Sequence, residues 1–210
     1  MKKNFILFDF DGVIVDSFAP AFSVTKVICP DVTEDDYRRR FEGNINSWQE
    51  SNHGHSNKCQ HAIDFFSKYL PRMRKEVSLM KGMAEVIVES SKNFTLVIIS
   101  STTSQGIKNF LEDHHLLHYF TEILGNDISP SKIEKMKIIF SKYGIAAKDC
   151  LFITDTLGDL KEAAEVNIKT VAVTWGFHSL KTLEKGNPWV IVNTSQELLA
   201  TINNQDSFNL

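Results

Sequence analysis

Cysteine is scarce in this sequence, and its few cysteines do not form a disulfide framework pattern. The three cysteines, Cys29, Cys59 and Cys150, are odd in number and far apart along the 210 residues. Small secreted domains that depend on disulfides carry many cysteines at short spacings. We therefore expect these three side chains to be reduced thiols packed within the protein.

Long apolar runs are also missing. No run approaches the about 20 consecutive apolar residues that a membrane-spanning helix needs. The start Met1-Lys2-Lys3 is followed closely by Asp9 and Asp11, which is not the layout of a cleavable signal sequence. The sequence thus predicts a cytoplasmic protein that has no membrane partner.

No block of like charge stands out either. The formal net charge is -3, and lysine and arginine form no basic stripe. Proteins that bind nucleic acid usually carry such a stripe or patch, so we expect no nucleic-acid partner. The apolar fraction of 42% is enough for a full core, which predicts one large domain or a core with a smaller insertion. The composition predicts no particular oligomeric state.

The first apolar stretch ends in two carboxylates. Residues 5–8 have the length and composition of a strand, Asp9 and Asp11 follow two residues apart, and Gly12 opens a turn. Because side chains alternate along a strand, both carboxylates should converge at its carboxyl end, where open α/β sheets place ligands. The alternative is an acidic turn or helix cap after an ordinary strand.

The rest of the chain divides into two parts. Residues 17–80 are polar and helical, contain Pro20, Pro30 and Pro71 as expected breakers, and offer no strand candidate. From residue 81 strands alternate with helices, which predicts an α/β fold with a doubly wound parallel sheet. Its core would comprise residues 1–16 and 81–210, with 17–80 as an inserted α-helical cap. The predicted strands are 95–99, 123–124, 150–153, 170–173 and 190–192, and the predicted helices are 83–91, 105–115, 131–143, 157–166 and 195–202.

Polar side chains follow two more of these strands. Ser100 and Ser101 begin a hydroxyl-rich stretch at a helix start, where hydroxyl and N–H groups bind phosphate oxygens. Asp155 and Asp159 add two carboxylates to the two after the first strand. Four carboxylates at one sheet edge repel one another unless a cation is present, which predicts a hard divalent ion such as Mg²⁺. Plain helix capping is the alternative for each of these residues.

A lysine at the start of helix 131–143 is the remaining candidate. Lys132 would offset the charge of the carboxylates and of a phosphate, although most lysines are simply solvated. Lys135 lies one turn further along the same helix and is the alternative to Lys132.

These stretches resemble the motifs of the haloacid dehalogenase superfamily, in its phosphatase branch. Residues 9–17 are similar to the first motif, and Ser100 stands where the second has Ser or Thr. Lys132 resembles the lysine of the third motif, and Asp155 with Asp159 resembles the paired acids of the fourth.

The resemblance covers nearly the whole chain. The insertion 17–80 looks like the family's small α-helical cap on a Rossmann-like core, and Trp175-Gly176-Phe177 is similar to phosphoglycolate-phosphatase-like members. The chain departs from the pattern at Thr154, where the family often has Gly. It also has Ile133 where Pro often follows the lysine, which is why Lys135 stays open as the motif lysine.

The resemblance implies a Mg²⁺-dependent phosphatase that hydrolyses a small phosphorylated metabolite, a phosphomonoester, through an aspartyl phosphate. Asp9 would be the nucleophile, and Asp11 would protonate the leaving alcohol and then activate water. Asp9, the backbone carbonyl of Asp11 and Asp155 would hold Mg²⁺. The phosphoryl group would bind to Ser100, the Ser101 N–H and Lys132. Asp159 would orient Lys132 or a metal-bound water.

Two rival functions share the same scaffold. A phosphomutase similar to β-phosphoglucomutase would use the same motifs and return the phosphoryl group to a sugar. A non-catalytic phosphate-binding or regulatory protein would be expected to have lost Asp9, Asp11 or Asp155, and none is lost.

Two stretches of the predicted cap remain. Gly43-Asn44-Ile45-Asn46 is a candidate substrate-facing loop, with an ordinary turn as the alternative. A second stretch gathers four potential zinc ligands. A structural zinc site usually spreads its ligand pairs over a longer loop, so we favour a polar loop over a metal site there. Those four residues are His53, His55, Cys59 and His61.

Overall fold

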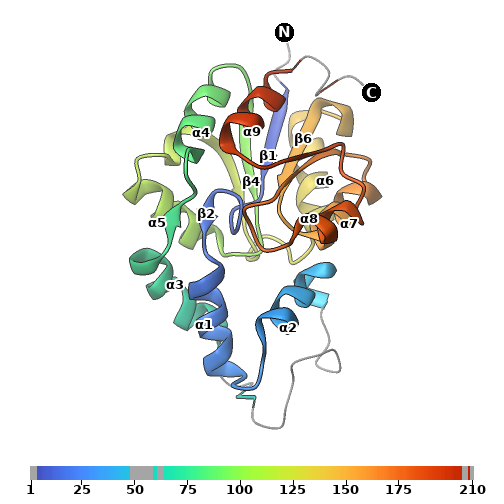
Figure 1. The fold of residues 1–210 in the computed structure, drawn as a ribbon. Coiled ribbons are helices and arrows are strands. Elements are labelled where there is room, and N and C mark those ends of the chain that lie inside the picture. The colour runs from blue at the N-terminus through green and yellow to red at the C-terminus, as the bar shows by residue number, and fades with distance from the viewer. Residues whose placement is uncertain (1–3, 48–58, 61–63, 205–207, 209–210) are drawn as a thin grey trace.

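A six-stranded parallel sheet lies between two layers of helices (Figure 1). The structure is a computed structural model that describes residues 4–47, 59–60, 64–204 and 208. The strand order is β5-β4-β1-β6-β7-β8, and every pair of neighbours is parallel. The strands are β1 (Phe5–Phe8), β4 (Thr95–Ile99), β5 (Phe120–Leu124), β6 (Cys150–Thr154), β7 (Lys169–Val173) and β8 (Val190–Val192).

The central strand β1 marks the point where the strand order reverses. From β1 the chain builds β4 and β5 on one side and then β6, β7 and β8 on the other. In open α/β sheets a ligand binds at this point, outside the carboxyl ends of the strands. The predicted α/β fold with a doubly wound parallel sheet and a helical insertion is confirmed.

Alternation along β1 explains why both faces of the sheet are covered. Ile6 and Phe8 belong to one buried cluster with α4, α5 and α9, whereas Phe5 and Leu7 belong to a second with α6 and α7. A strand that is apolar on both faces is typical of a parallel sheet between helix layers. The helices are α4 (Met83–Ser91), α5 (Ser104–Asp113), α6 (Lys132–Tyr143), α7 (Leu157–Glu165), α8 (Leu180–Glu184) and α9 (Ser195–Ile202). Of these, the short α8 was not predicted.

Three helices form a cap beyond the carboxyl ends of the strands, at the bottom of Figure 1. They are α1 (Phe18–Ile28), α2 (Glu34–Arg39) and α3 (Phe65–Glu76). Two of the expected breakers, Pro20 and Pro71, lie inside α1 and α3, so that part of the prediction was wrong. Pro20 sits in the first turn of α1, where the missing N–H has no helical acceptor to lose.

The chain passes between core and cap through a small antiparallel pair of strands. Here β2 (Val15–Asp16) pairs with β3 (Ser78–Leu79). The prediction that residues 17–80 contain no strand was therefore wrong. A strand of two residues is too short to show an alternating pattern. Its partner also lies about sixty positions away along the chain, because Asp16 pairs with Ser78.

A disulfide joins two of the cysteines within the cap. Cys29, directly after α1, is bonded to Cys59, and the N–H of Gln60 donates to the carbonyl of Ile28 at 2.7 Å. The expectation of reduced thiols was thus wrong for this pair, because the fold returns residue 59 to the end of α1. Cys150 is buried and lies outside this disulfide, as expected.

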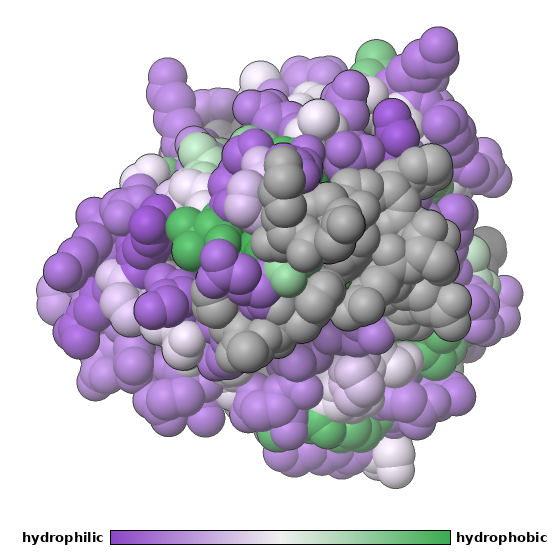
Figure 2. Space-filling view, turned by 90° about the horizontal axis from the view of Figure 1, so that it is seen from below, coloured by the Kyte–Doolittle hydropathy of each residue, from purple (hydrophilic) through white to green (hydrophobic). Residues whose placement is uncertain are grey.

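The possible zinc cluster is not tested, because His53, His55 and His61 lie outside the described residues. Seen from the cap side, the described surface is mostly hydrophilic (Figure 2). Within the described ranges, no helix combines the length and apolar character that crossing a membrane requires.

Candidate active site

A cavity of about 330 Å³ lies between the cap and the carboxyl ends of the strands. The core contributes mostly polar and charged side chains to its wall, and the cap contributes mostly apolar and aromatic ones. The core residues are Asp9, Asp11, Ser101, Thr102, Lys132, Thr156, Asp159, Glu162 and Phe177. The cap residues are Ala21, Thr25, Ile28, Tyr37, Arg40, Phe41, Gly43, Ile45, Asn46, Phe65, Phe66 and Tyr69.

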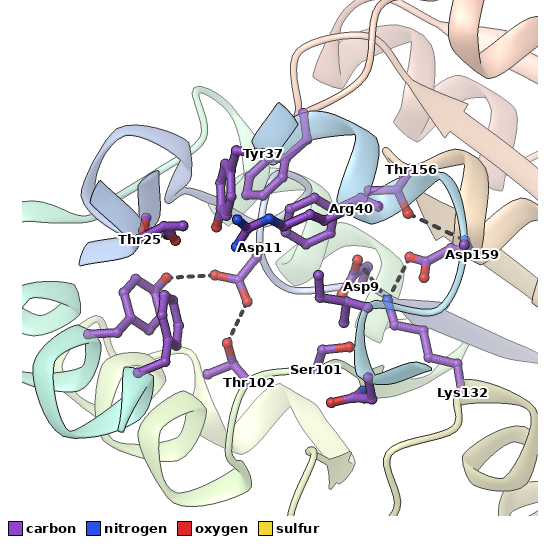
Figure 3. A pocket seen from close by; sticks show the side chains of 18 of the residues that line it. Asp9, Asp11, Thr25, Tyr37, Arg40, Ser101, Thr102, Lys132, Thr156 and Asp159 are labelled. Carbon is purple, nitrogen blue, oxygen red and sulfur yellow. Dashed lines mark hydrogen bonds and ion pairs between the residues drawn. The ribbon is translucent and has the colours of Figure 1, made fainter. Parts of the chain in front are cut away.

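Asp9 directly follows β1 and is paired with a lysine. The Nζ of Lys132 lies 2.8 Å from Asp9 Oδ2 and 2.6 Å from Asp159 Oδ2, and all three side chains are buried (Figure 3). Burial raises the pKa of Asp9 well above its usual range, and the ammonium of Lys132 offsets this only in part. The site therefore holds a buried carboxylate whose charge calls for additional cationic partners.

Asp159 and Lys132 stabilise each other's charged forms. Burial acts against the charge of Asp159, but Lys132 and the hydroxyl of Thr154, which donates to Oδ2 at 2.6 Å, hold its pKa below the usual range. Burial likewise acts against the charge of Lys132, yet Asp159 and Asp9 keep its pKa raised. Lys132 is therefore a permanent cation at the cavity wall.

Asp155, directly after β6, has one buried carboxylate oxygen without a hydrogen-bond partner. Its Oδ2 accepts a hydrogen bond from the Phe177 N–H at 2.6 Å, whereas Oδ1 is buried and makes no hydrogen bond. Burial raises the pKa of Asp155 to about 7. Gly12 has φ +74°, and a Cβ there would lie 2.0 Å from Asp155 Oδ2, so only glycine lets this loop pass so close to the carboxylate.

Asp11 shares the cavity with Asp9, but its carboxylate is held by hydroxyl groups. The hydroxyl of Tyr69, from α3 of the cap, donates to Oδ1 at 2.7 Å, and that of Thr102 donates to Oδ2 at 2.7 Å (Figure 3). Burial, followed by the nearby charge of Asp11, raises the pKa of Tyr69, so its hydroxyl keeps its proton. One carboxyl group therefore links the core to the cap.

The two lysines proposed for the third motif occupy different places. Lys132 contacts the carboxylates, whereas Lys135 is fully buried and donates from Nζ to the carbonyl of Ser100 at 2.6 Å. Burial and the proximity of Lys132 lower the pKa of Lys135 to about 8. Ser101 lines the cavity, while Ser100 lies behind it, with its Oγ accepting from the Thr102 N–H at 3.0 Å.

The candidate loop 43–46 lies against the core. Gly43, Ile45 and Asn46 line the cavity, and Asn44 donates to Glu162 Oε1 at 2.9 Å. Glu162 also accepts from the N–H of Lys132 at 3.1 Å, and burial raises its pKa. This glutamate therefore connects the cap loop to the helix that carries the lysine.

Several side chains that line the cavity were not predicted, and among them are Arg40, Tyr69, Thr102 and Glu162. Thr102 lies in the hydroxyl-rich stretch that drew attention to Ser100 and Ser101, so its composition was a usable signal. Arg40, Tyr69 and Glu162 lie in helical stretches that read as amphipathic or solvated. Their position depends on how the cap packs on the core, which no local pattern reveals.

The donors at the carboxyl ends of β1 and β6 fit a hard divalent cation. Asp155 Oδ1 is a buried oxygen that lacks a hydrogen-bond partner, and the neighbouring Asp9 carboxylate adds further oxygen donors. Over the described part of the chain, no three acidic, histidine or cysteine side chains gather around a common point. The expected set needs only two carboxylates, because its third member is the backbone carbonyl of Asp11.

Comparison with known proteins supplies a family. The model of the family described as haloacid dehalogenase-like hydrolase matches residues 6–173. The phosphoglycolate phosphatase of Synechococcus elongatus is 25% identical over 94% of this chain and 96% of its own length. The probable phosphatase IndB of Dickeya dadantii is 26% identical over 94% of this chain and 92% of its own. Phosphoglycolate phosphatase of Aliivibrio fischeri is 25% identical, but the match spans only 50% of its length.

Solved structures share the fold over almost the whole chain. A haloacid dehalogenase-like hydrolase from Streptococcus pneumoniae has a TM-score of 0.74 at 22% identity, covering 95% of this chain and 98% of its own. A haloacid dehalogenase-like protein of unknown function from Agrobacterium tumefaciens has a TM-score of 0.75 at 18% identity, covering 95% and 97%.

Proposed function

The chain belongs to the haloacid dehalogenase-like hydrolase family and is a phosphatase of that family, and we propose that it hydrolyses small phosphomonoesters through a phosphoenzyme at Asp9. The observation that carries this proposal is the buried pair of Asp9 and Lys132 at the floor of the cavity, 2.8 Å apart. A carboxylate nucleophile and a fixed cation are the two groups that such a transfer needs next to the phosphorus atom.

In the first step, a carboxylate oxygen of Asp9 forms a bond to phosphorus while the bond from phosphorus to the ester oxygen breaks. Asp11 gives its proton to the departing oxygen, which leaves as an alcohol. In the second step, water attacks the phosphorus of the aspartyl phosphate and Asp11 takes up a proton from it. Inorganic phosphate leaves, and Asp9 and Asp11 return to their starting states.

The charge that develops on the phosphoryl oxygens is stabilised by Lys132 and by donors that follow β4. The Ser101 N–H is the expected backbone donor, and Ser101 lines the cavity. Asp159 keeps Lys132 protonated and fixes its position through the 2.6 Å contact. Asp9, Asp155 and the Asp11 carbonyl would hold Mg²⁺, which when bound offsets the negative charge of the phosphoryl oxygens.

The cap gives Asp11 its position. Asp11 is held between Thr102 of the core and Tyr69 of α3, so its carboxyl group is in place when α3 lies over the cavity. A closed cap also excludes bulk water from the phosphoenzyme. We infer that cap closure and the acid–base step are coupled through Tyr69.

The names of two relatives suggest which compound to assay first as a substrate. The Synechococcus relative is named a phosphoglycolate phosphatase, and the Dickeya relative is named a probable phosphatase. Phosphoglycolate is therefore one compound to assay, next to a generic aryl phosphate that reports turnover of any phosphomonoester.

The test is phosphate release from an aryl phosphate, with and without Mg²⁺. We expect Mg²⁺-dependent turnover by the native chain and a loss of more than about 10³-fold in Asp9→Asn, because the amide is not a nucleophile. Asp16→Asn is the matched control, because this substitution removes the same charge at an exposed position in β2. Absence of turnover by the native chain on both the aryl phosphate and a panel of metabolite phosphates would overturn the proposal.

A further inference from the structure

The cap side of the cavity is more apolar than a small polar substrate requires. Six large side chains with no polar atoms line the cavity that Asp9 and Asp11 also line, five from the cap and one from the loop after β7. They are Ile28, Phe41, Ile45, Phe65, Phe66 and Phe177. Aromatic and aliphatic walls of this kind bind ligands that bring apolar surface of their own.

Most polar groups on the cap wall are already used within the protein. The hydroxyl of Tyr69 donates to Asp11, and that of Thr25 donates to the carbonyl of Ala21 at 3.1 Å. The side-chain amide of Asn46 donates to the carbonyl of Pro130 at 2.8 Å. These groups therefore serve the structure of the cap and its contact with the core.

Arg40 differs from these residues because it brings a charge. Among the described lining residues, it is the one cationic side chain that the cap contributes. Figure 3 shows its guanidinium reaching into the space above Asp11, beside Tyr37, whose ring centroid lies 5.9 Å from the Arg40 Cζ. A guanidinium stays charged in a half-buried wall, and its planar donors match a carboxylate or phosphate better than a neutral group.

The size of the cavity favours a substrate larger than phosphoglycolate. The nine non-hydrogen atoms of phosphoglycolate, its phosphate included, fill on the order of 200 Å³, since one water takes about 30 Å³. The cavity measures about 330 Å³. Phosphoglycolate with its phosphate at Asp9 and Lys132 would thus leave part of the cavity beside the aromatic wall unfilled, whereas an ester with a ring-sized body would fill it.

Resting on the proposed phosphatase function, we propose that the substrate is a phosphomonoester whose leaving group has an apolar, ring-sized body and carries an anionic group that binds Arg40. The apolar body packs against the aromatic wall of the cap, and the phosphate lies at Asp9 and Lys132. Arg40 is then a specificity-determining residue that contacts the part of the substrate remote from phosphorus.

Four phosphate esters test this inference, because they vary the ring and the carboxylate separately. They are ethyl phosphate, phosphoglycolate, benzyl phosphate and 4-carboxybenzyl phosphate. In all four esters the leaving group is a primary alcohol, so the comparison reports recognition more than leaving-group chemistry. For the native chain with Mg²⁺, we expect kcat/KM for 4-carboxybenzyl phosphate to exceed that for phosphoglycolate by at least about 10-fold.

The matched variants are Arg40→Gln and Arg39→Gln. Arg39 is the exposed neighbour, with an ion pair to Asp36 at 3.6 Å. We expect Arg40→Gln to lower kcat/KM for 4-carboxybenzyl phosphate by about 10-fold or more, mainly through KM, and to change that for benzyl phosphate by less than about 3-fold. Arg39→Gln should leave both values unchanged.

Three results would overturn the inference. If kcat/KM for phosphoglycolate equalled or exceeded that for 4-carboxybenzyl phosphate, the proposed ring-sized body would be refuted and the phosphatase function would stand. If Arg40→Gln lowered kcat/KM equally for all four esters, Arg40 would not be the residue that binds the carboxylate of the substrate. Failure of the native chain on all four esters and on the aryl phosphate would overturn the phosphatase function itself.

Discussion

At the scale of single residues, the position of Asp11 is the least expected feature of the site. The strand pattern placed Asp9 and Asp11 at one sheet edge, and both line the cavity. Only the fold reveals that Tyr69, fifty-eight positions further along the chain, donates to Asp11. From the sequence, a tyrosine in an amphipathic helix is interpreted as a packing residue, because the helix itself does not specify the partner of its hydroxyl.

Removing the Tyr69 hydroxyl tests its role in positioning Asp11. We expect Tyr69→Phe to lower kcat about 10-fold with a smaller change in KM, since one hydrogen bond to a charged group contributes about 1.5–3 kcal/mol. The ring stays in place against Phe65, at a centroid distance of 5.2 Å. Tyr143→Phe removes a comparable hydroxyl, which donates to Glu122 at 2.6 Å, and should leave kcat unchanged. Equal effects of the two variants would contradict the positioning role.

The two lysines of α6 provide a second test at this scale. Lys132→Met removes the cation beside Asp9, and we expect it to lower kcat/KM by about 10²–10³-fold, the usual cost of one charge-stabilising donor. Lys135→Met removes the donor to Ser100 and should cost less than about 10-fold. Thermal melts of both variants check that each is folded. A larger loss in Lys135→Met than in Lys132→Met would assign the motif lysine to Lys135.

At the scale of elements, the core could be predicted strand by strand and helix by helix apart from the short α8, whereas only the helical character of the cap could be predicted. Regular alternation of apolar strands and amphipathic helices determines the order of the core, and α4, β4, β8 and α9 begin and end where predicted. The cap holds short elements such as β3, and its helix α3 runs through Pro71. Such features depend on contacts between segments, which periodicity along one segment does not record.

The disulfide in the cap also depends on a contact between distant segments, and its presence can be tested. Without reductant, the denatured chain should show one reactive thiol, that of Cys150, because Cys29 and Cys59 are joined. With reductant all three cysteines of the sequence should react. Three reactive thiols without reductant would contradict the bond in solution.

Reduction should also lower the melting temperature of the protein. A crosslink that closes a loop of 30 residues contributes about 3–4 kcal/mol in the chain-entropy model. At about 2–4 °C for each kcal/mol in a chain of this size, the expected decrease in melting temperature is about 6–16 °C. Cys59→Ala should melt near the reduced native protein and should not respond to reductant.

At the scale of the whole molecule, the core and the cap create the site where they meet. The core supplies Asp9, Lys132 and Asp155, while the cap supplies Arg40, Tyr69 and the aromatic wall. These core residues could be predicted because they lie where strands end or helices begin. Those cap residues could not, because they meet the core only when the cap packs on it.

Mg²⁺ should stabilise the folded molecule as a ligand of the native state. At 100 times its Kd, a ligand adds about 2.7 kcal/mol, which corresponds to a rise in melting temperature of about 5–10 °C. Asp155→Asn should abolish most of this rise. It should not destabilise the metal-free protein much, because the amide oxygen can still accept from the Phe177 N–H and a buried charge is removed. A full Mg²⁺ response in Asp155→Asn would contradict the assigned metal site.

The most direct test of the central claim is to detect the phosphoenzyme itself. The native chain is mixed with excess aryl phosphate and Mg²⁺, quenched in acid within one turnover, and analysed by mass spectrometry of its peptides. We predict the added mass of one phosphoryl group on the peptide that contains Asp9, absent in Asp9→Asn and present in Asp16→Asn. Rapid phosphate release with no phosphorylated peptide at Asp9, or with the label on another residue, would contradict the account.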